Sequence, residues 1–157
     1  MSLSYNQIIK LNREFSEAHY ILKNFDNGFV YDILDKNQTA SFKYPLMFME
    51  DLQMPIQDGV ETFGFRVYFM QTVAGNEDRG DDLINDPTNE AKSDMLQCAK
   101  DFISWWKQDT TYPEFTIEPT SSRQTFQDET EDRLTGCYID IVFRQRFTYS
   151  ACNLPMA

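Results

Sequence analysis

The side chains that could carry chemistry in this chain are one histidine, three cysteines and a set of acids. His19 has no second histidine to complete a metal pair, and its place beside an apolar stripe favours a packing or surface role over ligation. Cys98, Cys137 and Cys152 are too widely spaced for a zinc or redox motif. The phosphate-loop, dinucleotide-binding, nucleophile-elbow and zincin motifs are absent from the sequence. We therefore expect no catalytic residue, no metal site and no cofactor.

The acids give the chain its strongest global property, a formal net charge of −11. Nucleic-acid binding relies on Lys and Arg to neutralise phosphates, so this charge argues against a protein that grips DNA or RNA. The charge can serve solubility alone. Alternatively, an acidic wall keeps DNA from adhering where it must slide past. The sequence leaves both interpretations open.

The densest acidic segment runs over residues 75–85. It lacks the alternating ligands, central glycine and terminal glutamate of an EF-hand calcium loop. A metal-dependent enzyme using Asp81, Asp82 and Glu90 is one hypothesis, although so acidic a chain is a poor host for a basic substrate groove. We expect a connector that faces a DNA passage or a neighbouring subunit, with an exposed position on an outer wall as the alternative. The acids concerned are Glu77, Asp78, Asp81 and Asp82.

Length and composition predict a folded domain that does not span a membrane. With 157 residues and 15% aromatic side chains, the chain can bury a sizeable core, and we expect a single structural domain over residues 1–157. We expect no signal peptide, and no apolar run reaches the 18 or so residues of a membrane span. Three unpatterned cysteines fit a reducing cytosol, where thiols serve as small core side chains.

Two helices are expected. Ser4 and Gln7 form a capping box, and apolar residues at three- and four-residue spacing then predict a helix of about five turns that ends near Asn24. Asp86 and Pro87 supply an N-cap and a first helical residue for a second helix, whose apolar face includes Cys98.

Strands are predicted over residues 29–34, 42–49, 60–70, 115–119 and 121–127, followed by a long final strand whose alternation is clearest over 137–144. Within the third of these strands, Phe63, Phe65, Val67 and Phe69 share one face, and Gly64 indicates a bulge or a close backbone approach. The order of helices and strands predicts an α+β fold with two helices packed on a mainly antiparallel β-sheet.

The final strand leads into an uncharged, largely apolar tail. Apolar residues at the end of a chain normally fray, so they indicate a segment that docks on another surface. We expect this tail to be an assembly interface. Its residues are Cys152, Asn153, Leu154, Pro155 and Met156.

Four short motifs resemble one protein family over nearly the whole chain. They are Tyr44-Pro45-Leu46-Met47-Phe48, the helical segment 94–102, Asp132-Arg133-Leu134-Thr135-Gly136-Cys137, and Cys152-Asn153-Leu154-Pro155. The pattern is similar to the tail-terminator-like proteins, or head–tail connector (neck ring) proteins, of Bacteroidetes phages. Cys137 departs from the pattern, because these relatives often carry Trp there.

The resemblance implies a virion structural protein without catalysis. Such a protein assembles in the host cytoplasm into a ring of six or twelve copies in the neck or tail. It contacts adjacent portal, connector or tail proteins and forms part of the DNA passage, without sequence-specific nucleic-acid binding and without a membrane. The alternative from a different class is an acidic adaptor or inhibitor that binds a basic protein partner.

Overall fold

In the computed structural model, residues 3–29, 43–73, 86–108, 111–127 and 134–147 are described. These residues form two helices and one seven-stranded sheet, which confirms the predicted α+β class. In chain order the elements are α1 (Tyr5–Ala18), β1 (Asn24–Asn27), β2 (Leu46–Asp51), β3 (Ile56–Gln57), β4 (Val60–Thr72), α3 (Pro87–Gln108), β5 (Phe115–Pro119), β6 (Gln124–Gln127) and β7 (Leu134–Arg146).

The sheet is built around one long antiparallel pair. Strands β4 and β7 pair over thirteen positions, from Val60 opposite Arg146 to Thr72 opposite Leu134. The strand order is β1-β2-β4-β7-β5, with β3 also beside β4 and β6 also beside β7. Every pairing is antiparallel except that of β1 with β2. The expectation of a mainly antiparallel sheet therefore holds.

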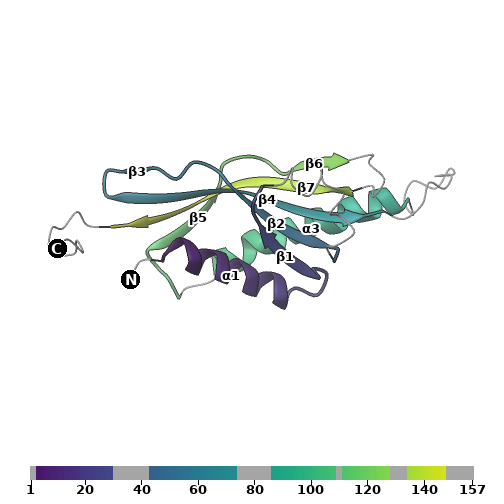
Figure 1. The fold of residues 1–157 in the computed structure, drawn as a ribbon, viewed down its shortest axis with the longest axis horizontal. Helices are drawn as coiled ribbons and strands as arrows, with labels where there is room; N and C mark the ends of the chain where they lie inside the picture. The colour runs from purple at the N-terminus through teal and green to yellow at the C-terminus, as the bar shows by residue number, and fades with distance from the viewer. Residues whose placement is uncertain (1–2, 30–42, 74–85, 109–110, 128–133, 148–157) are drawn as a thin grey trace.

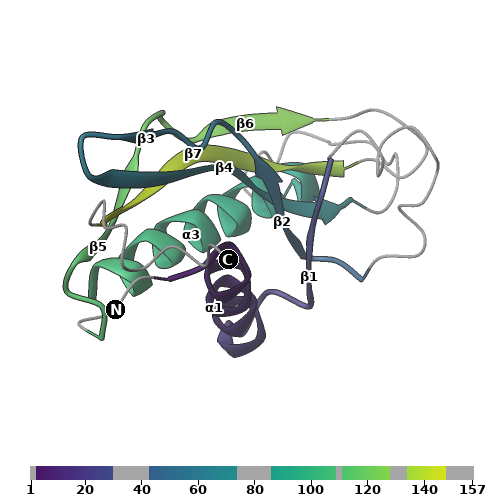
Figure 2. The same cartoon turned by 60° about the vertical axis from the view of Figure 1, so that its left-hand side comes forward.

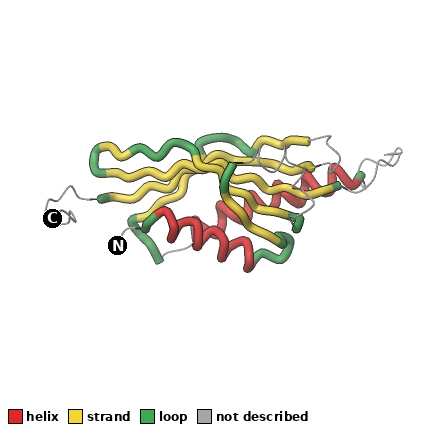
Figure 3. The backbone as a smooth tube through the Cα atoms, in the orientation of Figure 1, coloured by secondary structure: helices red, strands yellow, loops and turns green. Residues whose placement is uncertain are grey.

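Both helices cover the same face of this sheet (Figures 1, 2 and 3). Side chains alternate along a strand, so every second residue of β4 and β7 points toward the helices. The predicted face of β4 is confirmed, and β7 contributes the matching row. Each fully buried phenylalanine stabilises the fold by about 1.5–3 kcal/mol. The layer between the sheet and the two helices, which holds several of them, is the main hydrophobic core. The buried residues of the two strands in this core are Phe63, Phe65, Val67, Phe69, Cys137, Ile139, Ile141 and Phe143.

A second apolar cluster lies on the opposite face of the sheet. It contains Leu46 and Phe48 of β2, Tyr68 and Met70 of β4, and Leu134 of β7. Because Met47 and Met49 are buried in the main core, β2 is buried on both faces, as the apolar run in this segment predicts. The second cluster occupies one end of the sheet only.

Helix α1 begins as predicted but ends early. The Ser4 hydroxyl accepts a hydrogen bond from the amide of Gln7, and the Gln7 side chain accepts one from the amide of Ser4. The predicted end near Asn24 is wrong, because His19 adopts an extended conformation and caps the helix after Ala18. The chain then reverses into β1. Most of the predicted strand over 29–34 lies outside the described residues.

Candidate interaction surfaces

The two ends of the long β4–β7 pair are joined to segments of different amino-acid composition. At one end Thr72 pairs with Leu134, and β6 ends nearby with Gln127 opposite Thr135. Segments 74–85 and 128–133 therefore join the described sheet at this end, which we call the acidic end. Each of these two segments holds four acids and one arginine, so together they carry a formal charge of −6. The predicted acidic residues Glu77, Asp78, Asp81 and Asp82 lie in the first of them, outside the described residues.

The opposite end of the pair is a tight turn, which we call the hairpin end. Asp58 and Gly59, with φ angles of 53° and 74°, reverse the chain between β3 and β4. The amide of Phe147 donates to the carbonyl of Gly59 at 2.9 Å, which holds the end of β7 beside this turn. Segment 148–157 follows Phe147 in the sequence at this end. The predicted assembly residues Cys152, Asn153, Leu154, Pro155 and Met156 lie in this segment, outside the described residues.

The segments that contain the two surfaces predicted from the sequence are therefore attached to opposite ends of the β4–β7 pair. At about 3.4 Å per residue, the thirteen-residue pair spans about 40 Å. The described residues at which these two segments join the sheet are separated by the length of the pair.

An open groove lies at the hairpin end, on the face opposite the helices. Its volume is about 510 Å³. The floor has apolar side chains from β4 and β7, Val60 and Val142, and the ion pair of Arg144 with Glu118 lies at its edge. The lining residues are Gln53, Pro55, Gln57, Asp58, Val60, Thr62, Val142 and Arg144. The sequence predicted the turn at Asp58 but not this groove, because the groove depends on how residues 52–55 leave the sheet.

The predicted special role of Gly64 explains that departure. A Cβ atom on Gly64 would lie 2.5 Å from the carbonyl oxygen of Gln53, so only glycine allows the backbone of residues 52–53 this close. The amide of Leu52 donates to the carbonyl of Gly64 at 2.8 Å, and the amide of Gly64 donates to Gln53 at 3.1 Å. This bulge leaves Leu52 37% exposed at the surface.

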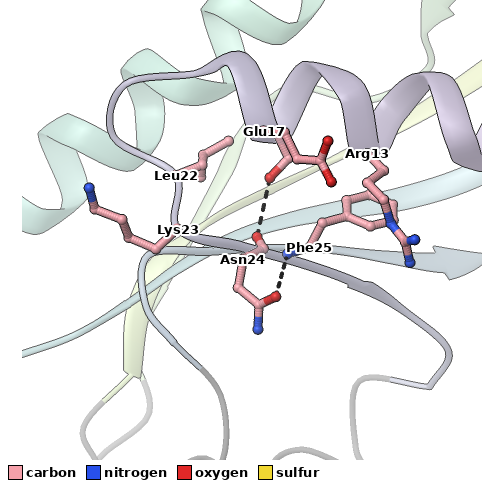
Figure 4. A pocket seen from close by; sticks show the side chains of 7 residues that line it. Arg13, Glu17, Leu22, Lys23, Asn24 and Phe25 are labelled. Carbon is pink, nitrogen blue, oxygen red and sulfur yellow. Dashed lines mark hydrogen bonds between the residues drawn. The ribbon is translucent and has the colours of Figure 1, made fainter.

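A second depression of about 470 Å³ lies between α1 and β1 (Figure 4). The Arg13 guanidinium lies 5.8 Å from the centre of the Phe25 ring, and Ser16 donates to the carbonyl of Asn24 at 3.2 Å. In Figure 4 the side chains of Arg13 and Lys23 point away from each other. Their charges do not converge, so this depression lacks the geometry of an anion site.

His19 is fully engaged in joining the two helices. Its Nδ1 accepts a hydrogen bond from the amide of Ile21 at 3.2 Å, and its Nε2 lies 2.8 Å from a carboxylate oxygen of Asp101 in α3. The other carboxylate oxygen accepts from Gln97. The His19 side chain is only 6% exposed. These contacts give His19 the packing role expected from the sequence and leave neither ring nitrogen for a substrate.

Two of the three cysteines are buried in the main core. Cys98 of α3 and Cys137 of β7 are both fully inaccessible, and burial raises the pKa of each thiol to about 12. The Cys137 thiol donates to the carbonyl of Met95 at 3.4 Å. Because the thiolate is the nucleophile, these two cysteines are chemically inert near neutral pH. Cys152 lies outside the described residues.

The hypothesis of a carboxylate metal site finds no support in the described part of the chain. No group of three or more potential metal ligands occurs among these residues. Glu90 is exposed in the first turn of α3, whereas Asp81 and Asp82 fall outside the described residues. Within the same described ranges, no helix has the length and apolar character needed to cross a membrane.

One polar cluster on the open face had no signal in the sequence beyond strand alternation. Arg66 and Asp140 face each other across β4 and β7 and form a two-point ion pair, with N–O distances of 2.7 and 3.1 Å. The Arg66 guanidinium also lies 4.7 Å from the centre of the Tyr138 ring. The Asp140 carboxylate raises the pKa of Arg66 further above its ordinary value. The cluster is self-satisfied and therefore acts as a cross-strand brace.

No protein-family profile matches the chain, and no curated protein matches it significantly.

Proposed function

We propose that this chain is a virion structural protein that forms a ring at the head–tail junction or in the tail of a bacteriophage. The observation that carries the proposal is the long β4–β7 pair with chemically different ends. A closed ring joins one surface of each copy to a different surface of the next. An elongated subunit with an uncharged segment attached at one end and two acidic segments attached at the other offers such unlike surfaces. The four motifs that resemble tail-terminator-like proteins supply the phage context.

The ring has no catalytic role in this proposal. Chemistry at an uncharacterised site needs a nucleophile, a base and a group that orients them. In the described residues His19 is held by Ile21 and Asp101, and the thiols of Cys98 and Cys137 stay protonated. Each of these side chains is already used to hold the fold together.

The distribution of charge suits a DNA passage. The described residues carry 14 Asp and Glu against 11 Lys and Arg, so they account for only −3 of the net charge of −11. Segments 74–85 and 128–133 contribute −6 at one end of the sheet. Screening at physiological salt acts over about 8 Å, so acids repel a phosphate backbone only when they line a close wall. An exposed position of segment 74–85 on the outer perimeter is the alternative.

The decisive experiment is a measurement of assembly. We expect the purified protein to elute as a particle of six or twelve 18.5 kDa copies, with a ring in negative-stain electron micrographs. An 18.5 kDa monomer at every concentration would contradict the proposal. If that monomer bound a basic protein with strong salt dependence, the acidic adaptor or inhibitor would replace the ring as the function.

Charge reversal tests the acidic end. Replacing Glu77, Asp78, Asp81 and Asp82 by Lys should slow genome passage or disturb ring assembly. A matched control reverses the same number of exposed acids elsewhere, at Glu14, Glu17, Asp94 and Glu114. Equal effects of the two sets would show that total charge matters and that segment 74–85 has no special position.

A further inference from the structure

We infer that the groove at the hairpin end of one copy binds segment 148–157 of the neighbouring copy. This inference rests on the proposed ring, and it assigns the two surfaces that meet in it. The groove is formed by described residues of β3, β4, β7 and the bulge at 52–55. The occupant is a segment of this same chain.

The groove has the chemistry of a site for an extended, uncharged peptide. Val60, Val142 and Pro55 supply apolar surface, and the bulge held by Gly64 places the exposed Leu52 on the same face. The charged side chains in the lining, Asp58 and Arg144, are of opposite sign, so the groove offers no net charge to attract an ion. Arg144 is paired with Glu118 in addition.

Segment 148–157 matches this surface in composition. It contains no Asp, Glu, Lys or Arg, whereas a quarter of the whole chain is charged. Leu154 and Met156 provide apolar anchors, and Pro155 favours an extended backbone. A docked segment of this kind gains affinity from apolar side chains entering a groove.

The residue that precedes the segment, Phe147, lies beside the groove. The amide of Phe147 is bound to the carbonyl of Gly59, next to Val60 at the groove's floor. Ten residues reach at most about 33 Å when fully extended, which is enough to cross to an adjacent subunit. In a ring of parallel subunits every hairpin end lies on the same rim. The segment of one copy therefore starts level with the groove of the next.

The described residues of a single chain leave the groove open, so a neighbouring copy can supply the occupant. Leu52 is 37% exposed, and Gln53, Pro55 and Gln57 are exposed as well. Among the described residues of the same copy, none covers them. A contact from the segment of one copy to the groove of the next is a head-to-tail contact, which closes a ring rather than a two-fold dimer.

Disulfide trapping tests the contact with the full chain. Cys152 is the native thiol of the segment, and Cys98 and Cys137 do not compete because they are buried with pKa values of about 12. Thr62→Cys adds a partner thiol in the groove. With oxidised glutathione as the oxidant, we expect a ladder of covalent oligomers on a non-reducing gel. The ladder should be absent from Tyr20→Cys, at a site 77% exposed in the connection between α1 and β1, and from Thr62→Cys combined with Cys152→Ser.

The outcomes separate this inference from the proposed ring. A ring by mass and microscopy without a ladder would overturn the inference and leave the ring intact. A cross-link confined to the monomer would show that the segment binds its own copy and would also overturn it. A protein that is only monomeric would overturn both. As a second measurement, Leu52→Asp should raise the concentration of half-assembly at least about tenfold, and Tyr20→Asp should leave it unchanged.

Discussion

The two buried thiols should make the protein lose stability above pH 9. Cys98 and Cys137 are inaccessible in the folded state, and burial raises their pKa from 9.0 to about 12. In the unfolded chain both thiols ionise near pH 9. Between pH 9 and 12 the unfolded state therefore binds fewer protons than the folded state. Under this condition the free energy of unfolding falls as pH rises.

The size of the loss follows from the shift. At pH 10 a thiol with an unfolded pKa of 9 favours the unfolded state by RT ln 11, about 1.4 kcal/mol, and the folded thiol is still almost entirely protonated. The two thiols together lower the free energy of unfolding by roughly 3 kcal/mol between pH 8 and pH 10. This is a large fraction of the 5–15 kcal/mol typical of a domain.

Urea unfolding at pH 8, 9 and 10, with a reductant and constant ionic strength, measures this loss. Tyrosines and lysines also titrate near pH 10, so the comparison with Cys98→Ala isolates one thiol. The variant should be less stable at pH 8, because it leaves a small cavity. Its stability should nevertheless fall by roughly 1 kcal/mol less than that of the wild type between pH 8 and 10. Parallel curves for the two proteins would show that Cys98 ionises as readily in the folded state as in the unfolded one.

Three further substitutions test contacts that hold the fold. Asn12→Ala removes the buried acceptor of the Trp106 indole N–H, a 2.9 Å hydrogen bond, and should cost about 2–4 kcal/mol in chemical denaturation, with a smaller cost in a Trp106→Phe background. Gly136→Ala places a Cβ atom 1.9 Å from the carbonyl oxygen of Phe69 and should lower the melting temperature by more than 10 °C or prevent folding, as circular dichroism would show. Gln145→Ala breaks the hydrogen bonds of the Gln145 side chain to the backbone amide and carbonyl of Leu3, at 2.7 and 2.8 Å. The amide of Leu3 should therefore lose its protection from hydrogen exchange, and the amides of β4 should keep their protection.

Features with a local cause could be predicted from the sequence. The capping box at Ser4 and the turn at Asp58 depend on residues within a few positions of each other, and both form as expected. The alternation of β7 also correctly placed Cys137 and Ile141 on a buried face, because side chains in a strand must alternate. In addition, the Asp86 side chain accepts from a backbone amide in the first turn of α3 and so starts this helix at the predicted position.

Features that depend on distant partners could not be predicted. Strand β1 has the sequence Asn-Phe-Asp-Asn, which carries no strand signal, and it forms because Asn24 lies opposite Leu46 in parallel register. The apolar spacing from which the first helix was predicted to extend past Leu22 correctly indicated that Leu22 is buried. The Leu22 side chain, however, enters the core from the connection after the helix. The groove at the hairpin end likewise depends on the contact between Gly64 and Gln53, which are eleven positions apart.

The arrangement of charge bears on the choice between solubility and an acidic wall. A charge that served solubility alone would work equally well if it were spread over the whole surface. In this chain the described residues of helices and strands are close to neutral, at −3, and two short segments at one end of the β4–β7 pair carry −6. In a ring of parallel copies these segments would lie on one rim, and their mutual repulsion would oppose closure. An uncharged segment bound in the groove at the opposite end of the β4–β7 pair would offset that repulsion. The groove and the uncharged segment 148–157 are both at that end.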